Sequence, residues 1–188
     1  NIIIMIIIHF DDGLVIGEGS GALVLEEYEH AKSRGAPIFA ELVGFGTNTD
    51  GSHITQPNQA TMSGALSLAL ESAGLSPDVI GYVNGHGTAT HHGDIAESHA
   101  TREVFGRAVP ISSLKGYIGH TLGACGAIEA WATIRMMNEG WFAPNINLNT
   151  VDPACAELEY IQGEGKEIDT DYVMSNNFAF GGINSSLI

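Results

Sequence analysis

The chain has 188 residues, of which 44% are hydrophobic, so it is long and apolar enough to bury a sizeable core. Seven Lys and Arg against 22 Asp and Glu give a formal net charge of −15, which argues against nucleic acid or an anionic membrane as a partner. Cys125 and Cys155 cannot build a disulfide framework at this length, so we expect a reducing compartment such as the cytoplasm.

The first 11 residues differ in composition from the rest of the chain. The isoleucine-rich run at residues 2–8 is too short to span a bilayer, and no basic segment precedes it. Taken alone it predicts a short buried strand. Its strongly isoleucine-biased composition indicates a truncation, an uncertain sequence or a junction, so we place the folded domain at residues 12–188.

From Gly13 to Gly74 the chain predicts strands followed by helices. The glycine-broken run after Gly13 predicts a strand, residues 22–26 a second strand, and the segment that ends at Gly35 a short helix. Residues 38–47 have strand composition. The apolar stripe over residues 61–73 predicts a helix closed by Gly74.

The same order then repeats. Strands are predicted at residues 78–84 and 109–112, and helices at 91–105 and 122–138. The second of these helices is rich in small residues, so we expect other backbones to pack against it in the interior. Three more predicted strands end the chain, at residues 158–162, 172–176 and 184–188. The alternation predicts an α/β domain with a mixed β-sheet layered by helices, in which ligands bind at strand ends.

Two histidines lie among glycines, His86 in NGHGTAT and His120 in SLKGYIGHTLGACGAIEA. Glycine lets a backbone approach a ligand closely, so two such turns indicate one reaction centre. A neutral imidazole carries one N–H donor, and a converging pair can stabilise an oxyanion. A third segment, SNNFAFGGINSSL, predicts a mobile aromatic loop beside that centre, with Phe178 and Phe180.

Other polar residues near the two histidines have a structural and a functional interpretation. Lys115 and Glu129 would pair if buried, because an unpaired buried charge is costly, and the pair suits a structural role as well as a catalytic one. Thr88 and Thr90 occupy alternate positions, so their hydroxyls could face one side and bind a polar ligand arm. Simple turn stabilisation is the alternative.

Two further stretches contain residue types of a metal or dinucleotide site, but neither matches the required motif. Potential metal ligands crowd one stretch of the sequence: His86, His91, His92, Asp94 and His99. Their spacing matches neither a zinc finger nor HExxH, so we predict no metal site. The run GEGSGA at residues 17–22 precedes a predicted strand, whereas a dinucleotide-binding loop must open a helix.

The motifs resemble those of a known family. NGHGTAT, SLKGYIGHTLGACGAIEA and NNFAFGGINSSL are similar to the three C-terminal signatures of β-ketoacyl-acyl-carrier-protein synthases. DGLVIGEGSGALVLEEYEHAKSRGAPIFAELVGF resembles the segment that opens the second half of those enzymes. The resemblance implies the C-terminal half of a thiolase-like fold and an acyltransferase of fatty acid or polyene/polyketide biosynthesis. Such enzymes condense an acyl thioester with malonyl-carrier protein after decarboxylation.

The resemblance also implies roles, partners and cofactors. His86 and His120 would stabilise the enolate that forms as CO₂ leaves, and Lys115 with Glu129 would fix the geometry and charge of the site. The acyl carrier protein would be a partner, in a homo- or heterodimeric synthase. No cofactor is implied beyond the phosphopantetheine that carries the substrates.

Two residue pairs would contact the substrate if the resemblance holds. Thr88 and Thr90 would bind the phosphopantetheine arm, and Phe180 with Phe178 would gate the acyl chain. Ala179 stands where the family usually has glycine, which implies a stiffer gate.

The sequence departs from the family in lacking the nucleophilic cysteine, which belongs to the first half of those enzymes. Cys125 stands where the family usually has alanine, and Cys155 lies in a predicted loop, so neither is expected to be the nucleophile. We expect the chain to be inactive without the missing N-terminal half. A non-catalytic, chain-length-factor-like partner subunit and a binding domain without chemistry stay open as alternatives.

Overall fold

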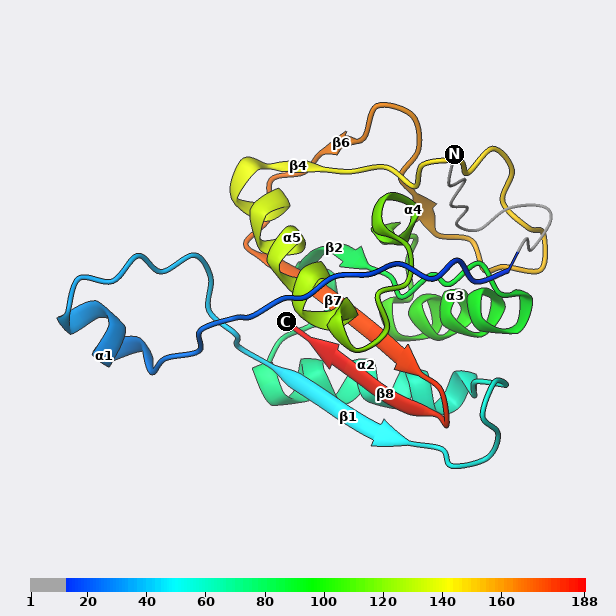
Figure 1. The fold of residues 1–188 in the computed structure, drawn as a ribbon, viewed down its shortest axis with the longest axis horizontal. Coiled ribbons are helices and arrows are strands. Elements are labelled where there is room, and N and C mark those ends of the chain that lie inside the picture. Colours follow the sequence, from blue (N-terminus) through cyan, green and yellow to red (C-terminus); the bar gives the residue numbers. More distant parts are fainter. Residues whose placement is uncertain (1–12) are drawn as a thin grey trace.

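The computed structural model describes residues 13–188, so the predicted strand or junction at residues 2–8 lies outside the described residues. A six-stranded sheet in the order β1-β8-β7-β2-β3-β5 forms the centre of the molecule (Figure 1). Its strands are β1 (Phe45–Thr49), β2 (Ile80–Asn84), β3 (Pro110–Ser112), β5 (Glu159–Tyr160), β7 (Tyr172–Ala179) and β8 (Ile183–Leu187). β7, β2, β3 and β5 are parallel, and β8 is antiparallel to both neighbours. The predicted α/β class with a mixed sheet is confirmed.

Helices cover both faces of this sheet (Figure 1). α2 (Gln59–Ala73) and α3 (His91–Phe105) lie on one face, and α5 (Cys125–Glu139) packs against β7 on the other. The first face buries the larger apolar core, which includes Leu66, Val83 and Met174. The second core contains Tyr82, Met136 and Phe142. The adjacent side chains Tyr82 and Val83 of β2 therefore enter different cores, as expected for a strand covered on both sides.

Shorter elements connect these layers. They are α1 (Tyr28–Ser33), α4 (Lys115–Ile118), the 3₁₀ turns Pro77–Val79 and Leu122–Ala124, and a two-stranded sheet of β4 (Trp141–Phe142) and β6 (Lys166–Glu167). Within residues 13–188, no helix has both the length and the apolar character that a membrane crossing requires.

The helix predictions hold because their ends carry local signals. The Asn58 side chain accepts the N–H of Ala60 at 2.9 Å at the start of α2, and Gly74 ends the helix in the left-handed conformation with φ 66°. α3 has the predicted bounds. The predicted helix at 122–138 begins instead with a 3₁₀ turn, and α5 itself starts at Cys125.

Of three strand predictions near the start of the chain, two are wrong and one holds only in part. Residues 22–26 form no strand, and within 38–47 only the last residues belong to β1. After Gly13, a single bridge between Ile16 and His120 replaces the predicted strand. These segments are extended, but the described residues place no neighbouring strand beside them, and a strand is defined by such pairing.

The parallel strands determine where the site lies. The carboxyl ends of parallel neighbours meet at one edge of a sheet, which is the usual ligand-binding edge. The chain leaves β2 toward His86, leaves β3 toward Lys115 and His120, and turns back after β7 beside Phe178. Residues far apart in sequence therefore come together there.

Candidate functional site

The backbone at His86 is fixed by a buried carboxylate. Glu97 of α3, 5% exposed, accepts the N–H of His86 at 2.6 Å and that of Gly87 at 2.8 Å. The Ser113 hydroxyl donates to the His86 carbonyl at 3.3 Å. Burial raises the pKa of Glu97, and the two N–H donors partly oppose that rise. Glu97 was not predicted to belong to the site.

The backbone at His120 is fixed by the segment that follows Gly13. The His120 N–H donates to the Val15 carbonyl at 2.8 Å, and the Gly17 N–H donates to the His120 carbonyl at 3.0 Å. Gly119 has φ +72°, and a Cβ there would lie 2.8 Å from the Gly17 Cα. Only glycine allows this close approach.

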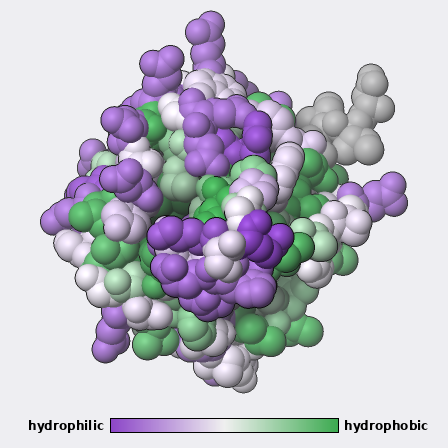
Figure 2. All heavy atoms as spheres, turned by 90° about the vertical axis from the view of Figure 1, so that its left-hand side faces the viewer, coloured by the Kyte–Doolittle hydropathy of each residue, from purple (hydrophilic) through white to green (hydrophobic). Residues whose placement is uncertain are grey.

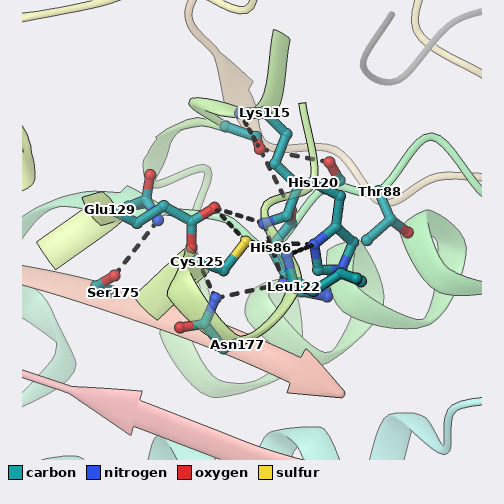
Figure 3. Close-up of polar contacts among 12 residues, drawn as sticks. His86, Thr88, Lys115, His120, Leu122, Cys125, Glu129, Ser175 and Asn177 are labelled. Carbon is teal, nitrogen blue, oxygen red and sulfur yellow. Dashed lines mark hydrogen bonds and ion pairs between the residues drawn. The ribbon is translucent and has the colours of Figure 1, made fainter. Parts of the chain in front are cut away.

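The two imidazoles meet edge to face. Their ring centroids are 5.1 Å apart and their planes are nearly perpendicular, at 89° (Figure 3). His86 Nδ1 lies 3.1 Å from Lys115 Nζ and 3.4 Å from Asn177 Nδ2. An ammonium group can only donate, so His86 Nδ1 accepts, and the proton of the neutral ring is assigned to Nε2.

His120 has the same tautomer for a different reason. Its Nδ1 accepts the backbone N–H of Leu122 at 3.1 Å, and Cys125 Sγ lies 3.3 Å from the same nitrogen (Figure 3). A backbone N–H cannot accept, so the ring proton is again assigned to Nε2. Both rings thus have one Nε2–H donor that is free of partners among residues 13–188.

Both imidazoles are neutral at neutral pH. Burial, then the charge of Lys115 and the ring of His120, hold the pKa of His86 well below its usual 6.5. Burial and the Lys115 charge lower the pKa of His120 to about 4. Two adjacent neutral donors can therefore coexist where two imidazolium ions would repel each other.

A buried ion pair supports the histidines. Lys115 and Glu129 are 2% and 0% exposed, and Lys115 Nζ donates to Glu129 Oε1 at 2.5 Å, which confirms the predicted pairing. Asn177 Nδ2 donates to Glu129 Oε2 at 2.7 Å. Asn177 lies in the third motif, but its residue type alone does not distinguish it from its neighbours. The Lys115 ammonium thus bridges a carboxylate and the His86 ring.

Cys125 is the first residue of α5 and belongs to the same network. Its Sγ lies 3.6 Å from Glu129 Oε1, and its side chain is buried. Burial raises the pKa of the thiol, which disfavours the reactive thiolate. Another backbone segment packs against α5 as predicted, since a Cβ on Gly21 would lie 3.3 Å from the backbone nitrogen of Ile128.

A cavity of about 300 Å³ opens in front of the two rings. All four residues predicted to contact the substrate line this cavity: Thr88, Thr90, Phe178 and Phe180. The two threonine hydroxyls lie 2.9 Å apart, on one side of the loop as predicted. Thr90 precedes α3 without capping it, so its hydroxyl stays directed toward Thr88.

The third motif forms a hairpin rather than a loop, so that prediction needs correction. Phe178 belongs to β7, is 7% exposed, and packs edge to face on His86 at 6.2 Å between centroids. Phe180 lies in the turn and is 57% exposed. Antiparallel pairing of β7 with β8, in which Phe178 lies opposite Asn184, fixes the backbone that carries the Phe178 ring.

Three of the possible metal ligands have other partners in the structure. His91 lies 3.8 Å from Asp152, His99 contacts the Ala154 carbonyl at 3.0 Å, and Asp94 accepts the N–H of Thr88 at 3.1 Å. Within residues 13–188 no group of three or more His, Cys, Asp or Glu is arranged to hold a metal ion.

Comparison with known proteins places this geometry in a family. The profile of the β-ketoacyl synthase C-terminal domain matches residues 39–149. The chain is 46% identical to a chloroplastic 3-oxoacyl-[acyl-carrier-protein] synthase II of Arabidopsis thaliana over 94% of this chain and 34% of that protein. It is 41% identical to 3-oxoacyl-[acyl-carrier-protein] synthase 2 of Vibrio harveyi over 94% of this chain and 44% of that protein. The chain thus spans less than half the length of these relatives.

Solved structures give the same result. A β-ketoacyl synthase from Burkholderia phymatum STM815 is 65% identical, with a TM-score of 0.85 over 86% of this chain and 40% of that chain. The ishigamide ketosynthase/chain length factor is 35% identical, with a TM-score of 0.91 over 97% and 46%. A type II polyketide synthase ketosynthase in complex with its acyl-carrier protein is 37% identical, with a TM-score of 0.93 over 98% and 46%. The fold is thiolase-like, and the chain belongs to the β-ketoacyl synthase family.

Proposed function

We propose that this chain supplies the two-histidine half of a 3-oxoacyl-[acyl-carrier-protein] synthase. The observation that supports this function is the pair of neutral Nε2–H donors of His86 and His120, 5.1 Å apart between ring centroids, at one cavity. The names of the relatives support the synthase family and its transferase chemistry.

In the proposed reaction, the two histidines hold the carbonyl oxygen of a malonyl thioester. As the bond to the carboxylate breaks, CO₂ leaves and its bonding electron pair passes into the thioester, which becomes an enolate. The negative charge builds on the oxygen that receives the two N–H donors, so both bonds strengthen in the transition state. The enolate carbon then attacks an acyl thioester held on a cysteine of the missing half, and that thiolate departs.

The other site residues have supporting roles in this proposal. The Lys115 ammonium keeps His86 in the donor tautomer, and Glu129 balances its charge. Thr88 and Thr90 bind the phosphopantetheine arm of the acyl carrier protein, and Phe178 and Phe180 shape the entrance for the acyl chain. The reaction requires no metal and no further cofactor. A cytoplasmic location stays a prediction, because the Arabidopsis relative is named as chloroplastic.

The alternative is a non-catalytic partner subunit of the same fold. The likeness to the ishigamide ketosynthase/chain length factor supports it, since that assembly includes a subunit named for chain length. It differs from the first proposal in one testable respect: such a subunit would not need two free Nε2–H donors.

The test uses a hybrid in which this chain replaces the matching part of the Vibrio harveyi synthase. We expect His86→Ala or His120→Ala to slow malonyl decarboxylation by about 10²- to 10³-fold, the usual cost of removing one oxyanion donor. His99→Ala is the matched control, because His99 is exposed on α3 and does not line the cavity. Decarboxylation that is unchanged in both histidine variants would reject the enzyme and favour the partner subunit.

A further inference from the structure

The buried carboxylate of Glu129 lies behind both histidines. Charged side chains usually lie at the surface, and Figure 2 shows hydrophilic residues projecting from one face of the molecule, whereas Glu129 is 0% exposed. Lys115, Asn177 and Cys125 contact this carboxylate, and each of them also contacts the Nδ1 atom of one imidazole (Figure 3). Lys115 balances the charge of Glu129, and the other two side chains bring only neutral donors.

Asn177 extends from β7 between Glu129 and His86. Its Nδ2 donates to Glu129 Oε2 at 2.7 Å and lies 3.4 Å from His86 Nδ1. An amide nitrogen carries two N–H donors, so one can serve each acceptor. The reversed amide would place its oxygen 2.7 Å from a carboxylate oxygen, and two acceptors repel, which excludes it. Asn177 therefore joins the carboxylate to the His86 ring.

Close packing fixes the position of the Asn177 amide. Gly126 of α5 faces it, and a Cβ on Gly126 would lie 2.8 Å from Asn177 Oδ1. The backbone of Asn177 is held as well, because it pairs opposite Ser185 of β8. A side chain that is already ordered loses little conformational entropy when it binds. The amide is thus suited to orient its two acceptors.

Cys125 stands in the same relation to Glu129 and His120. Its side chain is 3% exposed, and Sγ lies 3.3 Å from His120 Nδ1 and 3.6 Å from Glu129 Oε1. The thiol has one proton for these two acceptors. If the proton pointed to Glu129, a sulfur lone pair would face the lone pair of His120 Nδ1 at 3.3 Å, and the two would repel. The S–H bond is therefore assigned to Nδ1.

We propose that Asn177 and Cys125 are positioning residues, one for each histidine: Asn177 orients Glu129 and His86, and Cys125 orients His120. The inference deepens the proposed function, on which it rests for the reaction that the two rings serve. A donor on Nδ1 keeps the ring proton on Nε2, and hydrogen bonds in such chains strengthen one another. Both residues thus act on the substrate oxygen through an imidazole.

Nitrogen NMR of the Vibrio harveyi hybrid, labelled at histidine, tests this proposal without relying on activity. Loss of a donor moves the resonance of an unprotonated imidazole nitrogen downfield, toward its value in a free neutral ring. Asn177→Ala should therefore move the Nδ1 resonance of His86 and leave that of His120 in place. Cys125→Ala should do the reverse.

The rate of malonyl decarboxylation gives a second readout. Asn177→Ala should lower kcat about 10-fold, the cost of one hydrogen bond to a charged group, and Cys125→Ala about 3-fold, because a thiol is a weak donor. KM should stay unchanged, since both residues support an interaction that strengthens in the transition state. Cys125→Ser should restore the wild-type kcat, because a hydroxyl also donates.

An aspartate at position 177 separates the donors from the shape of the side chain. Asn177→Asp keeps the size of the amide but places a second carboxylate against Glu129, and the two repel until one of them binds a proton. The protonated carboxyl can then donate as the amide does. We expect kcat of this variant to be low above neutral pH and to recover as the pH falls, whereas a purely structural role predicts no such recovery.

Matched controls have the same residue types outside the site. Asn48 is half-buried, its amide donates to the Thr61 carbonyl at 2.7 Å, and it does not line the cavity. Cys155 lies outside the cavity as well. Asn48→Ala and Cys155→Ala should leave kcat and both histidine resonances unchanged.

The outcome is separable from that for the proposed function. The expected movements of the His86 and His120 resonances in a hybrid without decarboxylase activity would support the positioning roles and reject the proposed function. Resonances that stay in place in Asn177→Ala and Cys125→Ala, or that move together in either variant, would overturn the positioning roles even in an active hybrid. If circular dichroism shows that the hybrid is unfolded, the same resonances measured on this chain alone decide.

Discussion

The cavity at His86 and His120 and the extended segment at residues 18–42, here called the arm, are neighbouring regions. They differ in how many of their side chains and backbone groups have partners within the chain. Around the cavity, each histidine has its backbone fixed, its Nδ1 occupied and its ring packed. In the arm, apolar side chains and backbone edges face solvent. The two regions join where Val15 and Gly17 hold the backbone of His120. The contacts that position the two histidines therefore lie within this chain, whereas the apolar surface of the arm has no cover among the described residues.

The largest expected effect tests whether the buried ion pair supports the cavity. Lys115→Ala leaves the Glu129 carboxylate buried without its cation, so we expect the free energy of unfolding to fall by about 3–5 kcal/mol. Urea unfolding measures it. The control is Lys166→Ala, because Lys166 and its partner Glu159 are 41% and 43% exposed and such pairs contribute below about 1 kcal/mol. Equal losses in the two variants would mean that the Lys115–Glu129 pair is solvated in solution.

Alanine substitutions of two leucines compare how much the body and the arm contribute to the free energy of unfolding. Leu66 is 0% exposed in the larger core, so Leu66→Ala should cost about 2–5 kcal/mol of unfolding free energy. Leu25 is 75% exposed, and Leu25→Ala should change that free energy by less than about 0.5 kcal/mol. Thermal or urea unfolding of the isolated chain checks both. A similar loss in the two variants would show that the arm packs tightly without a partner.

The pH dependence of stability tests the surroundings of His120. Its pKa in the folded chain is about 4, below the ordinary 6.5, so the unfolded chain binds the proton more readily between these values. The stabilising contribution is complete above pH 6.5 and is lost as the pH falls toward 4. We expect the wild type to lose about 2 kcal/mol more than His120→Gln across that window.

Comparison of the two chains isolates His120 from the other titrating groups. Glu97 has a raised pKa and acts in the opposite direction, but it is present in both chains and cancels in the difference. Parallel pH profiles for the wild type and the variant would contradict the burial of the His120 ring.

The sequence was sufficient where local signals decide the structure. Asn58 and Gly74 delimit α2, and glycines around His86 and His120 indicated turns that meet at one site. Lys115 and Glu129 could be paired in advance because a buried charge needs a partner. These inferences needed only the residue type and its neighbours in the chain.

Contacts between distant segments could not be predicted in the same way. Glu97 binds the backbone N–H groups of His86 and Gly87, and nothing in a helical glutamate indicates which loop it will meet. Asn177 is distinguished from its neighbours only by the pleat of β7, which directs it toward Glu129. Residues 22–26 have strand composition, yet a strand needs a neighbour that the described residues do not supply.

The most direct measurement of the central claim is nitrogen NMR of histidine-labelled protein at neutral pH. We expect His86 and His120 both to be neutral and to carry their proton on Nε2, with Nδ1 accepting from Lys115 and Leu122. His86→Ala and His120→Ala assign the two signals. Either ring in the Nδ1–H tautomer, or as an imidazolium ion, would contradict the claim that two N–H donors meet at the cavity.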